Sequence, residues 1–333
     1  MPKVAPLAIS MGDPAGIGPE VIAKAWARRD VEALPCFFAV GDVRAVSQVW
    51  TGPVERIDDP RDAPGVFARA LPVVSVVDGD AIIPGQPDIG GARCALQSLE
   101  MAAGLARSDA ASGLVTAPIS KVELYRIGFN YPGQTEFVAE RCGVARENAV
   151  MMLAGPTLRV VPITIHEPLA DVPMTLTIEL IVARARATAR GLMRDFGIDA
   201  PRLALAGLNP HAGESGAIGR EEIEVMQPAV AQLQAEGIDI VGPLAADTMF
   251  HPRARAKYDA ALCAYHDQAL IPIKTLHFDD GVNITLGLPI VRTSPDHGTA
   301  FDIAGEDRAE PGAMIAAIRM AGEAAARRAA AVA

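Results

Sequence analysis

Residues 261–305, ALCAYHDQALIPIKTLHFDDGVNITLGLPIVRTSPDHGTAFDIAG, concentrate the chemically distinctive side chains of this 333-residue chain. The stretch holds three of the six histidines and carries Lys274, Asn283 and Arg292 on short segments between apolar runs. An imidazole after a buried strand, followed by separated cationic and amide groups, suits a metal site beside an anion pocket. We therefore interpret the rest of the chain around this pairing.

Length and composition indicate a folded protein of two domains, or one large α/β unit with a deep cleft. Residues are 50% apolar and 21% charged, and the net charge of -10 disfavours nucleic-acid or anionic-membrane partners. The cysteines are far apart with no C-x-x-C spacing, so we expect reduced thiols. No apolar run approaches membrane-spanning length, and we expect a cytoplasmic protein.

Alternating apolar runs and helical stripes predict an α/β fold. The expected strands are 7–11, 36–42, 71–78 and 112–121, then a hairpin within 148–169 and a strand from 202. The expected helices are 21–29, 88–106, 135–143, 176–196 ended by Gly197, 221–237 kinked or divided at Pro228, and an Ala-rich one from 311. We place one domain at 1–128 plus 270–333, and the other at 129–269.

The turn GDPAGIGPE follows the first predicted strand. Its spacing is GxxxGxG rather than GxGxxG, and it lacks the Lys-Ser/Thr ending of a phosphate loop, so neither nucleotide fingerprint is met. A plain tight turn and a site role remain equally open. Asp13 is the candidate residue within it.

Three histidines follow three predicted strands: His166 after RVVPITI, His211 after RLALAGLNP and His266 after AALCAY. Ligands of open α/β sheets gather beyond the carboxyl ends of strands, so these imidazoles can converge on a divalent metal. The alternative is three separate capping or hydrogen-bonded core histidines. Their shared placement favours the metal site, whereas His251 and His277 lack it and receive no role.

Charged and amide neighbours complete the candidate site. Asp247 and Asp267 are candidates for proton transfer, with solvated loop acids as the alternative. Lys274 and Arg292 could neutralise a phosphate or carboxylate, although exposed salt-bridge partners are the alternative for each. Asn283 lies between apolar runs, where a buried amide needs partners.

Motifs along nearly the whole chain resemble 4-hydroxythreonine-4-phosphate dehydrogenases of vitamin B6 biosynthesis: GDPAGIGPE, LNPHAGE, ADT, YHDQ, GVNITLGLP and RTSPDHGTAFDIAG. The resemblance implies a two-domain α/β/α fold similar to isocitrate and isopropylmalate dehydrogenases, without a Rossmann domain. It also implies a homodimer with active sites at the interface. The resemblance further implies that His166, His211 and His266 bind the metal, with one of these ligands supplied by the partner subunit.

The same resemblance implies substrate contacts from Lys274, Asn283 and Arg292, and from Thr135 with the residue before it. The family commonly has a His-Thr pair where this chain has Gln134-Thr135. Glutamine can hydrogen-bond a substrate but cannot titrate or carry positive charge. A contact role for Gln134 therefore remains, and an acid-base role there does not follow.

The segment HGTAFDIAG is similar to the adenine-side cofactor loop of isopropylmalate dehydrogenases, which places His297, Gly298 and Asp302 near the cofactor. A carboxylate there would accept from a ribose hydroxyl and repel a 2′-phosphate, favouring NAD over NADP. A plain helix-start turn is the alternative.

The implied activity is NAD(P)- and metal-dependent (Zn, Mg or Co) oxidation of 4-phosphooxy-threonine, followed by decarboxylation. Dehydrogenases of phosphorylated threonate or erythronate, and an aromatic dihydrodiol dehydrogenase, share much of the framework. A non-catalytic metal- or metabolite-binding protein is the alternative from another class.

Overall fold

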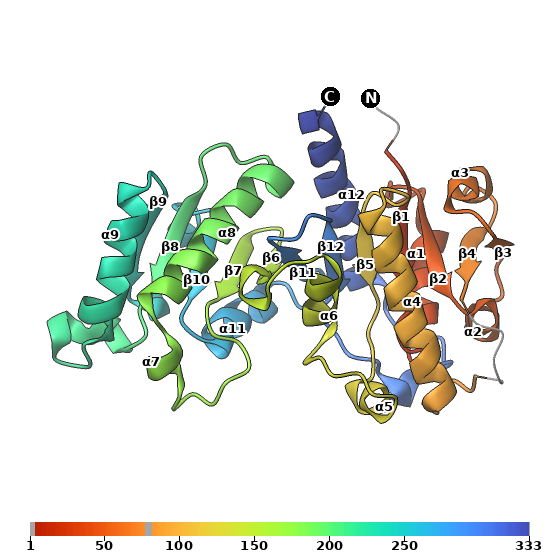
Figure 1. Cartoon of the computed structure of the whole chain (residues 1–333), viewed down its shortest axis with the longest axis horizontal. Coiled ribbons are helices and arrows are strands. Elements are labelled where there is room, and N and C mark those ends of the chain that lie inside the picture. The colour runs from red at the N-terminus through yellow and green to blue at the C-terminus, as the bar shows by residue number, and fades with distance from the viewer. Residues whose placement is uncertain (1–3, 77–81, 333) are drawn as a thin grey trace. The chain divides into compact units, whose positions relative to one another are not determined.

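The computed structural model describes residues 4–76 and 82–332, and it forms two compact units (Figure 1). The first unit comprises Met1–Val144 with Leu288–Ala333, and the second comprises Ala145–Gly287. A discontinuous first unit was predicted, but its boundaries need correction. Residues 129–144 belong to the first unit, and residues 270–287 belong to the second.

Contacts within each unit explain both boundary corrections. In the first unit, Arg292 donates a hydrogen bond to Thr135, which ties residues after 129 to the C-terminal part of the chain. In the second unit, residues 282–286 form a strand that pairs with the strand at residues 150–155. Contacts between residues far apart in the sequence therefore decide the boundaries of the two units. A local change in composition does not reveal such contacts.

The first unit is built on a parallel sheet with strand order β3-β4-β2-β1-β5-β12. Its central strands are fully buried and apolar, as expected for a parallel sheet covered on both faces. The strands are β1 (Leu7–Ser10), β2 (Phe37–Gly41), β3 (Val54–Ile57), β4 (Leu71–Ser75), β5 (Leu114–Thr116) and β12 (Arg292–Pro295).

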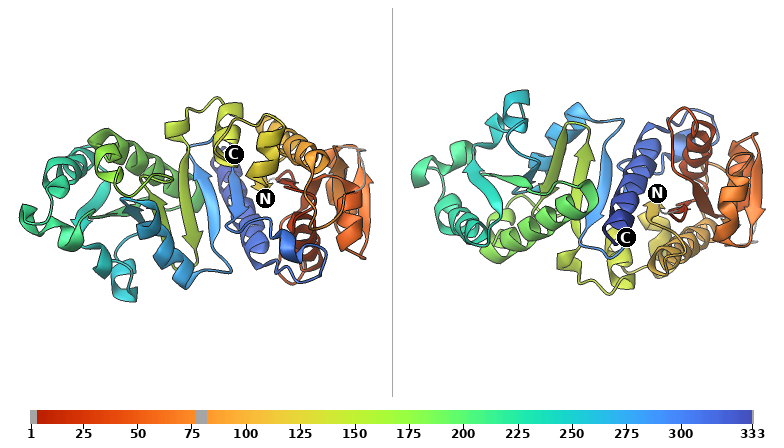
Figure 2. Two further views of the ribbon diagram at one scale, coloured as in Figure 1. Left: turned by 90° about the horizontal axis from the view of Figure 1, so that it is seen from below. Right: turned by 90° about the horizontal axis from the view of Figure 1, so that it is seen from above.

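Helices cover both faces of this first sheet. Helix α4 (Ile89–Arg107) packs on one face, and α1 (Gly18–Ala27) and α12 (Gly312–Val332) lie on the other (Figure 1, Figure 2). The Asp88 side chain caps α4 by accepting from the Gly91 N–H at 2.6 Å. Shorter elements are α2 (Val43–Val49), α3 (Ala63–Val66), α5 (Lys121–Arg126), α6 (Gln134–Arg141), η1 (Pro60–Asp62) and η6 (Phe301–Ile303).

The second unit has a mixed sheet with strand order β11-β6-β7-β10-β8-β9. Strands β6 and β7 form the predicted antiparallel hairpin, and β7, β10, β8 and β9 run parallel. The bounds are β6 (Val150–Gly155), β7 (Leu158–Pro162), β8 (Arg202–Ala206), β9 (Asp239–Leu244), β10 (Ala260–Cys263) and β11 (Val282–Leu286).

Helices also cover both faces of the second sheet (Figure 2). Helices α8 (Ile178–Phe196) and α9 (Gln227–Ala235) lie on one face, and α11 (His266–Leu276) lies on the other. The α/β/α prediction is thus confirmed. Shorter elements are α7 (Val172–Thr175), α10 (Pro252–Arg255), η2 (Arg146–Asn148), η3 (Pro210–Gly216), a π-helical turn η4 (Glu222–Met226) and η5 (Ala246–Thr248).

Local signals located most predicted elements. Gly197 ends α8 with a φ of 67°, and the helix predicted at 221–237 is divided between η4 and α9, with Pro228 in the first turn of α9. Strands β3, β9, β11 and β12 were not predicted, because charged, polar or proline residues interrupt their apolar pattern. Val77 and Asp78, at the end of the predicted 71–78 strand, lie outside the described residues.

Two further expectations concern membrane-spanning segments and the state of the cysteines. None of the helices in the described ranges is long and apolar enough to cross a membrane. All four cysteines have free thiols, as expected from their spacing.

Candidate functional site

Strands β7, β10 and β8 are parallel neighbours, so their carboxyl ends lie along one edge of the second sheet. His166 follows β7, His266 is the first residue of the helix after β10, and His211 lies in η3 after β8. The middle strand thus carries His266, flanked by the two loops that carry the other imidazoles. The structure therefore confirms the prediction that each of the three histidines follows the carboxyl end of a strand.

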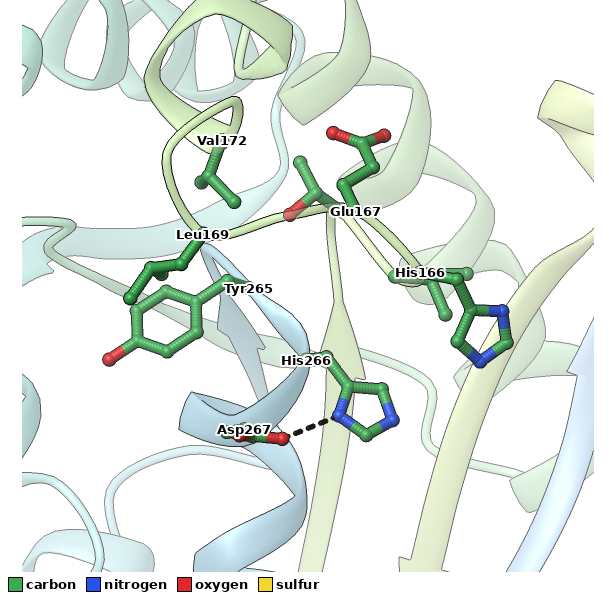
Figure 3. Close-up of a pocket in the computed structure, with 9 residues that line it drawn as sticks. His166, Glu167, Leu169, Val172, Tyr265, His266 and Asp267 are labelled. Carbon is green, nitrogen blue, oxygen red and sulfur yellow. Dashed lines mark hydrogen bonds and ion pairs between the residues drawn. The ribbon is translucent and has the colours of Figure 1, made fainter.

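His166 and His266 line a pocket of about 320 Å³, with Thr164, Ile165, Glu167, Leu169, Val172, Tyr265 and Asp267 (Figure 3). Their ring centroids are 5.8 Å apart, with 41° between the ring planes. With metal–nitrogen bonds of about 2.0–2.1 Å, a cation shared by two imidazoles needs ring centroids roughly 5–6 Å apart. This pair therefore fits two ligands of one divalent cation.

The carboxylate of Asp267 orients the ring of His266. Nδ1 of His266 lies 2.7 Å from Oδ1 of Asp267, and Figure 3 shows this contact beside the pocket. A carboxylate at Nδ1 keeps the proton on that nitrogen and leaves the lone pair of Nε2 for a ligand, as second-shell carboxylates do in metal sites. Glu167 points away from His266 and makes no such contact in the figure.

His211 has the same kind of carboxylate partner in an unusual turn. Its Nδ1 lies 2.7 Å from Oε1 of Glu214, and this contact raises the pKa of His211, with a smaller contribution from Asp247. Every residue from His211 to Ser215 has a positive φ, between 43° and 78°. Left-handed backbone costs L-residues roughly 1–2 kcal/mol each, so this turn needs support from its surroundings.

The described residues contain no group of three or more His, Cys, Asp or Glu side chains placed to hold one metal. The structure thus brings His166 and His266 together and does not add His211 to them within a single chain. The His211 side chain is 65% exposed and contacts Glu214 instead. Asp247, in η5, is also exposed.

Lys274 and Asn283 lie on the face of the second sheet that α11 covers. Leu286 of β11 meets Gly191 of α8, so Asn283, three residues earlier, points to the opposite face. Lys274 is in the last turn of α11. The Oδ1 atom of Asn283 is buried with no hydrogen-bond partner among the described residues, and a hydrogen bond from a ligand would offset that cost.

The first unit holds a polar cluster formed by Arg292 of β12 with Thr116 and Thr135. The guanidinium donates to Oγ1 of Thr116 at 2.7 Å and to Oγ1 of Thr135 at 3.2 Å. Arg292 is 3% exposed, and burial lowers its pKa to about 10, so it remains charged at pH 7. A buried charge beside the N-terminus of α6 is a good place for an anion, since a phosphate would offset the cost of burial.

Gln134 opens helix α6 next to this cluster. Its Nε2 donates to the carbonyl oxygen of Ala117 at 3.1 Å, which fixes the orientation of the amide. Its Oε1 is buried without a hydrogen-bond partner in the described part of the chain. Gln134 therefore presents an acceptor, which suits a hydroxyl or ammonium group and not a phosphate oxygen.

The predicted cofactor loop rests on the GDPAGIGPE turn. Ile17 N donates to the carbonyl oxygen of Thr299 at 3.0 Å, and a Cβ at Gly16 would lie 2.9 Å from the same oxygen. Nδ1 of His297 lies 3.1 Å from the Gly298 carbonyl, whereas its Nε2 is buried with no partner among the described residues. A side chain at Gly298 would meet open space, and Asp302 is exposed in η6.

Asp13, the candidate of the GDPAGIGPE turn, is a buried acid. It is 1% exposed, and its Oδ1 accepts from the Ala15 N–H at 3.0 Å. Burial raises its pKa to about 6, and the charges of Glu123 and Asp88 add to the effect. With this raised pKa, Asp13 is protonated to a larger extent near pH 6 than an exposed aspartate is.

Replacing Asp13 with asparagine is expected to raise the free energy of unfolding at neutral pH. The folded protein keeps the Asp13 proton up to about pH 6, whereas the unfolded chain loses it near the ordinary pKa of 3.8. The contribution of Asp13 to stability is therefore lost as pH rises from about 4 to 6, by up to about 3 kcal/mol. Denaturant unfolding at pH 4.5 and 7.5 checks this. A stability difference that is equal at both pH values would contradict it, with exposed Asp30→Asn as the control.

His277 has a structural role that its position in the sequence does not indicate. It is buried, its Nδ1 lies 3.0 Å from Oδ1 of Asp280, and its Nε2 lies 2.8 Å from Oγ1 of Thr157. Gly155 makes room for the ring, because a Cβ there would lie 2.4 Å from it. His277 therefore joins the end of α11 to the β6–β7 hairpin, a contact that only the folded chain reveals.

These features define an α/β protein with an imidazole pair at parallel strand ends and a buried arginine hydrogen-bonded to two threonines. The chain matches the model of the pyridoxal phosphate biosynthetic protein PdxA family over residues 34–321. It is 59% identical over 316 residues to a 4-hydroxythreonine-4-phosphate dehydrogenase of Zymomonas mobilis, covering 95% of this chain and 94% of the relative. The chain belongs to the PdxA family, which confirms the resemblance found in its motifs.

Solved structures support the same fold. The crystal structure of 4-hydroxythreonine-4-phosphate dehydrogenase from Klebsiella pneumoniae has a TM-score of 0.87 and 36% identity, covering 97% of this chain and 98% of that chain. A terephthalate 1,2-cis-dihydrodiol dehydrogenase from Burkholderia xenovorans is also similar, with a TM-score of 0.68 and 29% identity, covering 96% and 98%. Both similarities extend over nearly the full length, so the fold of both units is shared.

Proposed function

We propose that this protein is an NAD(P)- and divalent-metal-dependent oxidoreductase that converts 4-phosphooxy-L-threonine to 2-amino-3-oxo-4-phosphooxybutanoate. The product would lose carbon dioxide to give 3-amino-2-oxopropyl phosphate in pyridoxal phosphate biosynthesis. The observation that carries the proposal is the His166–His266 pair with its carboxylate partner, in a chain 59% identical to a relative named for this reaction.

His166 and His266 would bind the cation, with His211 as the third ligand. Because the described residues of one chain do not bring the three imidazoles together, a partner subunit would supply one of the ligands. Imidazole donors suit zinc or cobalt better than magnesium, which prefers oxygen. The cation supplies Lewis-acid polarisation of the C3 hydroxyl, and the nicotinamide supplies a hydride acceptor.

Asp267 and Asp247 would have different roles in the reaction. Asp267 is engaged with Nδ1 of His266 and would hold that ring in its ligand tautomer. Asp247 is exposed and close enough to His211 to raise its pKa, although Glu214 contributes more. Asp247 is therefore the better candidate for accepting the proton of the substrate hydroxyl.

The substrate would be fixed by Arg292 and Thr135 at its phosphate, and by Lys274 and Asn283 at its other polar groups. The buried guanidinium and the buried Oδ1 of Asn283 support these roles, because each has a desolvation cost that a ligand would offset. Gln134 would accept from a hydroxyl or amine of the substrate through its buried Oε1. This acceptor also suits a phosphorylated threonate or erythronate, which is the second candidate substrate class.

The cofactor would lie against His297, Gly298 and Asp302. Nε2 of His297 is a buried acceptor, which suits an amine or hydroxyl donor of the nucleotide. An exposed carboxylate at Asp302 would accept from a ribose hydroxyl and repel a 2′-phosphate, so NAD is preferred to NADP.

Exposed apolar side chains around the histidine pocket support a homodimer. Leu169 and Met174, in the segment after His166, are 65% and 85% exposed. Apolar side chains gathered beside a polar pocket are typical of a protein interface.

An absorbance assay for NADH tests the proposed reaction. Purified protein is mixed with 4-phosphooxy-threonine and NAD or NADP, with and without chelator, and with phospho-threonate as the parallel substrate. We expect chelator-sensitive turnover of the amino substrate. Turnover of phospho-threonate alone would move the enzyme to sugar-acid oxidation, and metal binding with no turnover of either would indicate a non-catalytic binding protein.

A further inference from the structure

The left-handed turn that carries His211 is held by a buried carboxylate on the neighbouring π-helical turn. Glu222 is 2% exposed, although glutamate is rarely buried in proteins. Its Oε1 accepts from the backbone N–H of Asn209 at 2.7 Å, and its Oε2 accepts from Asn209 Nδ2 at 3.0 Å. Glu222 thus accepts hydrogen bonds from both the backbone and the side chain of Asn209, the N-cap residue of η3.

The same carboxylate also packs against the middle of the turn. Gly213 has a φ of 78°, and a Cβ there would lie 2.6 Å from Oε2 of Glu222. The absence of a side chain at Gly213 therefore lets the carboxylate approach the turn. Ile218 N donates to the Gly213 carbonyl at 3.1 Å, which closes the turn on its other side.

We propose that Glu222 is a positioning residue, which holds residues 211–215 in the left-handed turn and so keeps Nε2 of His211 available as a metal ligand. The turn is what brings Glu214 to Nδ1 of His211, because both residues lie within it. Without the hydrogen bonds between Glu222 and Asn209, the unfavourable left-handed conformation of His211, Ala212, Glu214 and Ser215 would no longer be stabilised. The inference rests on the proposed function for the role of the metal, whereas the contacts of Glu222 with the turn do not depend on that function.

Glu222→Gln tests the role with little change of shape, because it replaces one acceptor oxygen with a donor that faces the N–H groups of Asn209. The matched control is Glu224→Gln, which removes the same charge from an exposed side chain two residues away. The first measurement is calorimetric titration of metal-free protein with Co²⁺. We expect Glu222→Gln to weaken Co²⁺ binding about 10- to 100-fold and Glu224→Gln to leave it unchanged.

The second measurement follows the imidazole directly. In ¹⁵N-histidine-labelled protein at one pH, His211 should show a protonated Nδ1 in the wild type and in Glu224→Gln, because Glu214 accepts from it. In Glu222→Gln we expect this signal to shift toward a mixture of tautomers. A merely structural role for Glu222 would lower stability without changing the tautomer of His211.

The inference is overturned if Glu222→Gln keeps both wild-type Co²⁺ affinity and the His211 tautomer, or if both glutamine variants weaken binding equally. If Glu222→Gln does not fold, Asn209→Ala removes one of the two contacts and should shift both readouts in the same direction. Wild-type protein that fails to bind Co²⁺ would count against the proposed function. The imidazole measurement would then decide the positioning role by itself.

Discussion

Replacing His211 with alanine is expected to lower kcat/KM about 10³-fold or more while leaving the fold intact. Metal polarisation of a substrate oxygen is worth several kcal/mol, and each 1.36 kcal/mol is a tenfold change in rate. The side chain is 65% exposed, so its removal leaves no cavity in the core. Steady-state kinetics with 4-phosphooxy-threonine, together with metal content after purification, measure the effect.

A second histidine provides the control for this experiment. His251 is exposed at the start of α10 and has no proposed role, so His251→Ala should keep wild-type kinetics and metal content. Substantial turnover by His211→Ala without bound metal would refute the metal mechanism. Loss of activity in both variants would point to a general effect on folding, which circular dichroism would detect.

Replacing Arg292 with methionine is expected to lower kcat/KM about 10²- to 10³-fold, mainly through a higher KM. The buried guanidinium would offer charge-assisted hydrogen bonds to a phosphate, each worth about 1.5–3 kcal/mol. Its pKa, lowered to about 10 by burial, shows the cost of keeping this charge out of water. Kinetics across substrate concentration separate KM from kcat.

Stability distinguishes a binding role for Arg292 from a structural one. Apolar replacement of a costly buried charge is often neutral or stabilising, so the melting temperature of Arg292→Met should not fall. The matched control is Arg319→Met on α12, where the arginine pairs with Glu32 at the surface. A lower melting temperature with unchanged KM would show that Arg292 serves only the packing of Thr116 and Thr135.

Local patterns in the sequence were enough to predict the α/β class and the strand ends that carry His166, His211 and His266. An apolar run followed by a polar turn encodes a buried strand and its end without knowledge of distant residues. Gly197 and Pro228 likewise marked helix boundaries, because backbone constraints act on the nearest turns. The motif series identified the family for the same reason, since each motif is a short contiguous segment.

Tertiary structure alone decided which of these side chains meet. The sheet order places the strand of His266 between those of His166 and His211, yet only His166 lies against His266. The left-handed turn at His211, the burial of Arg292 and the contact of His277 with Thr157 depend on residues 13 to 157 positions away in the sequence. Sequence periodicity records which face of its own element a residue occupies, whereas contacts between elements are set by strand order and packing.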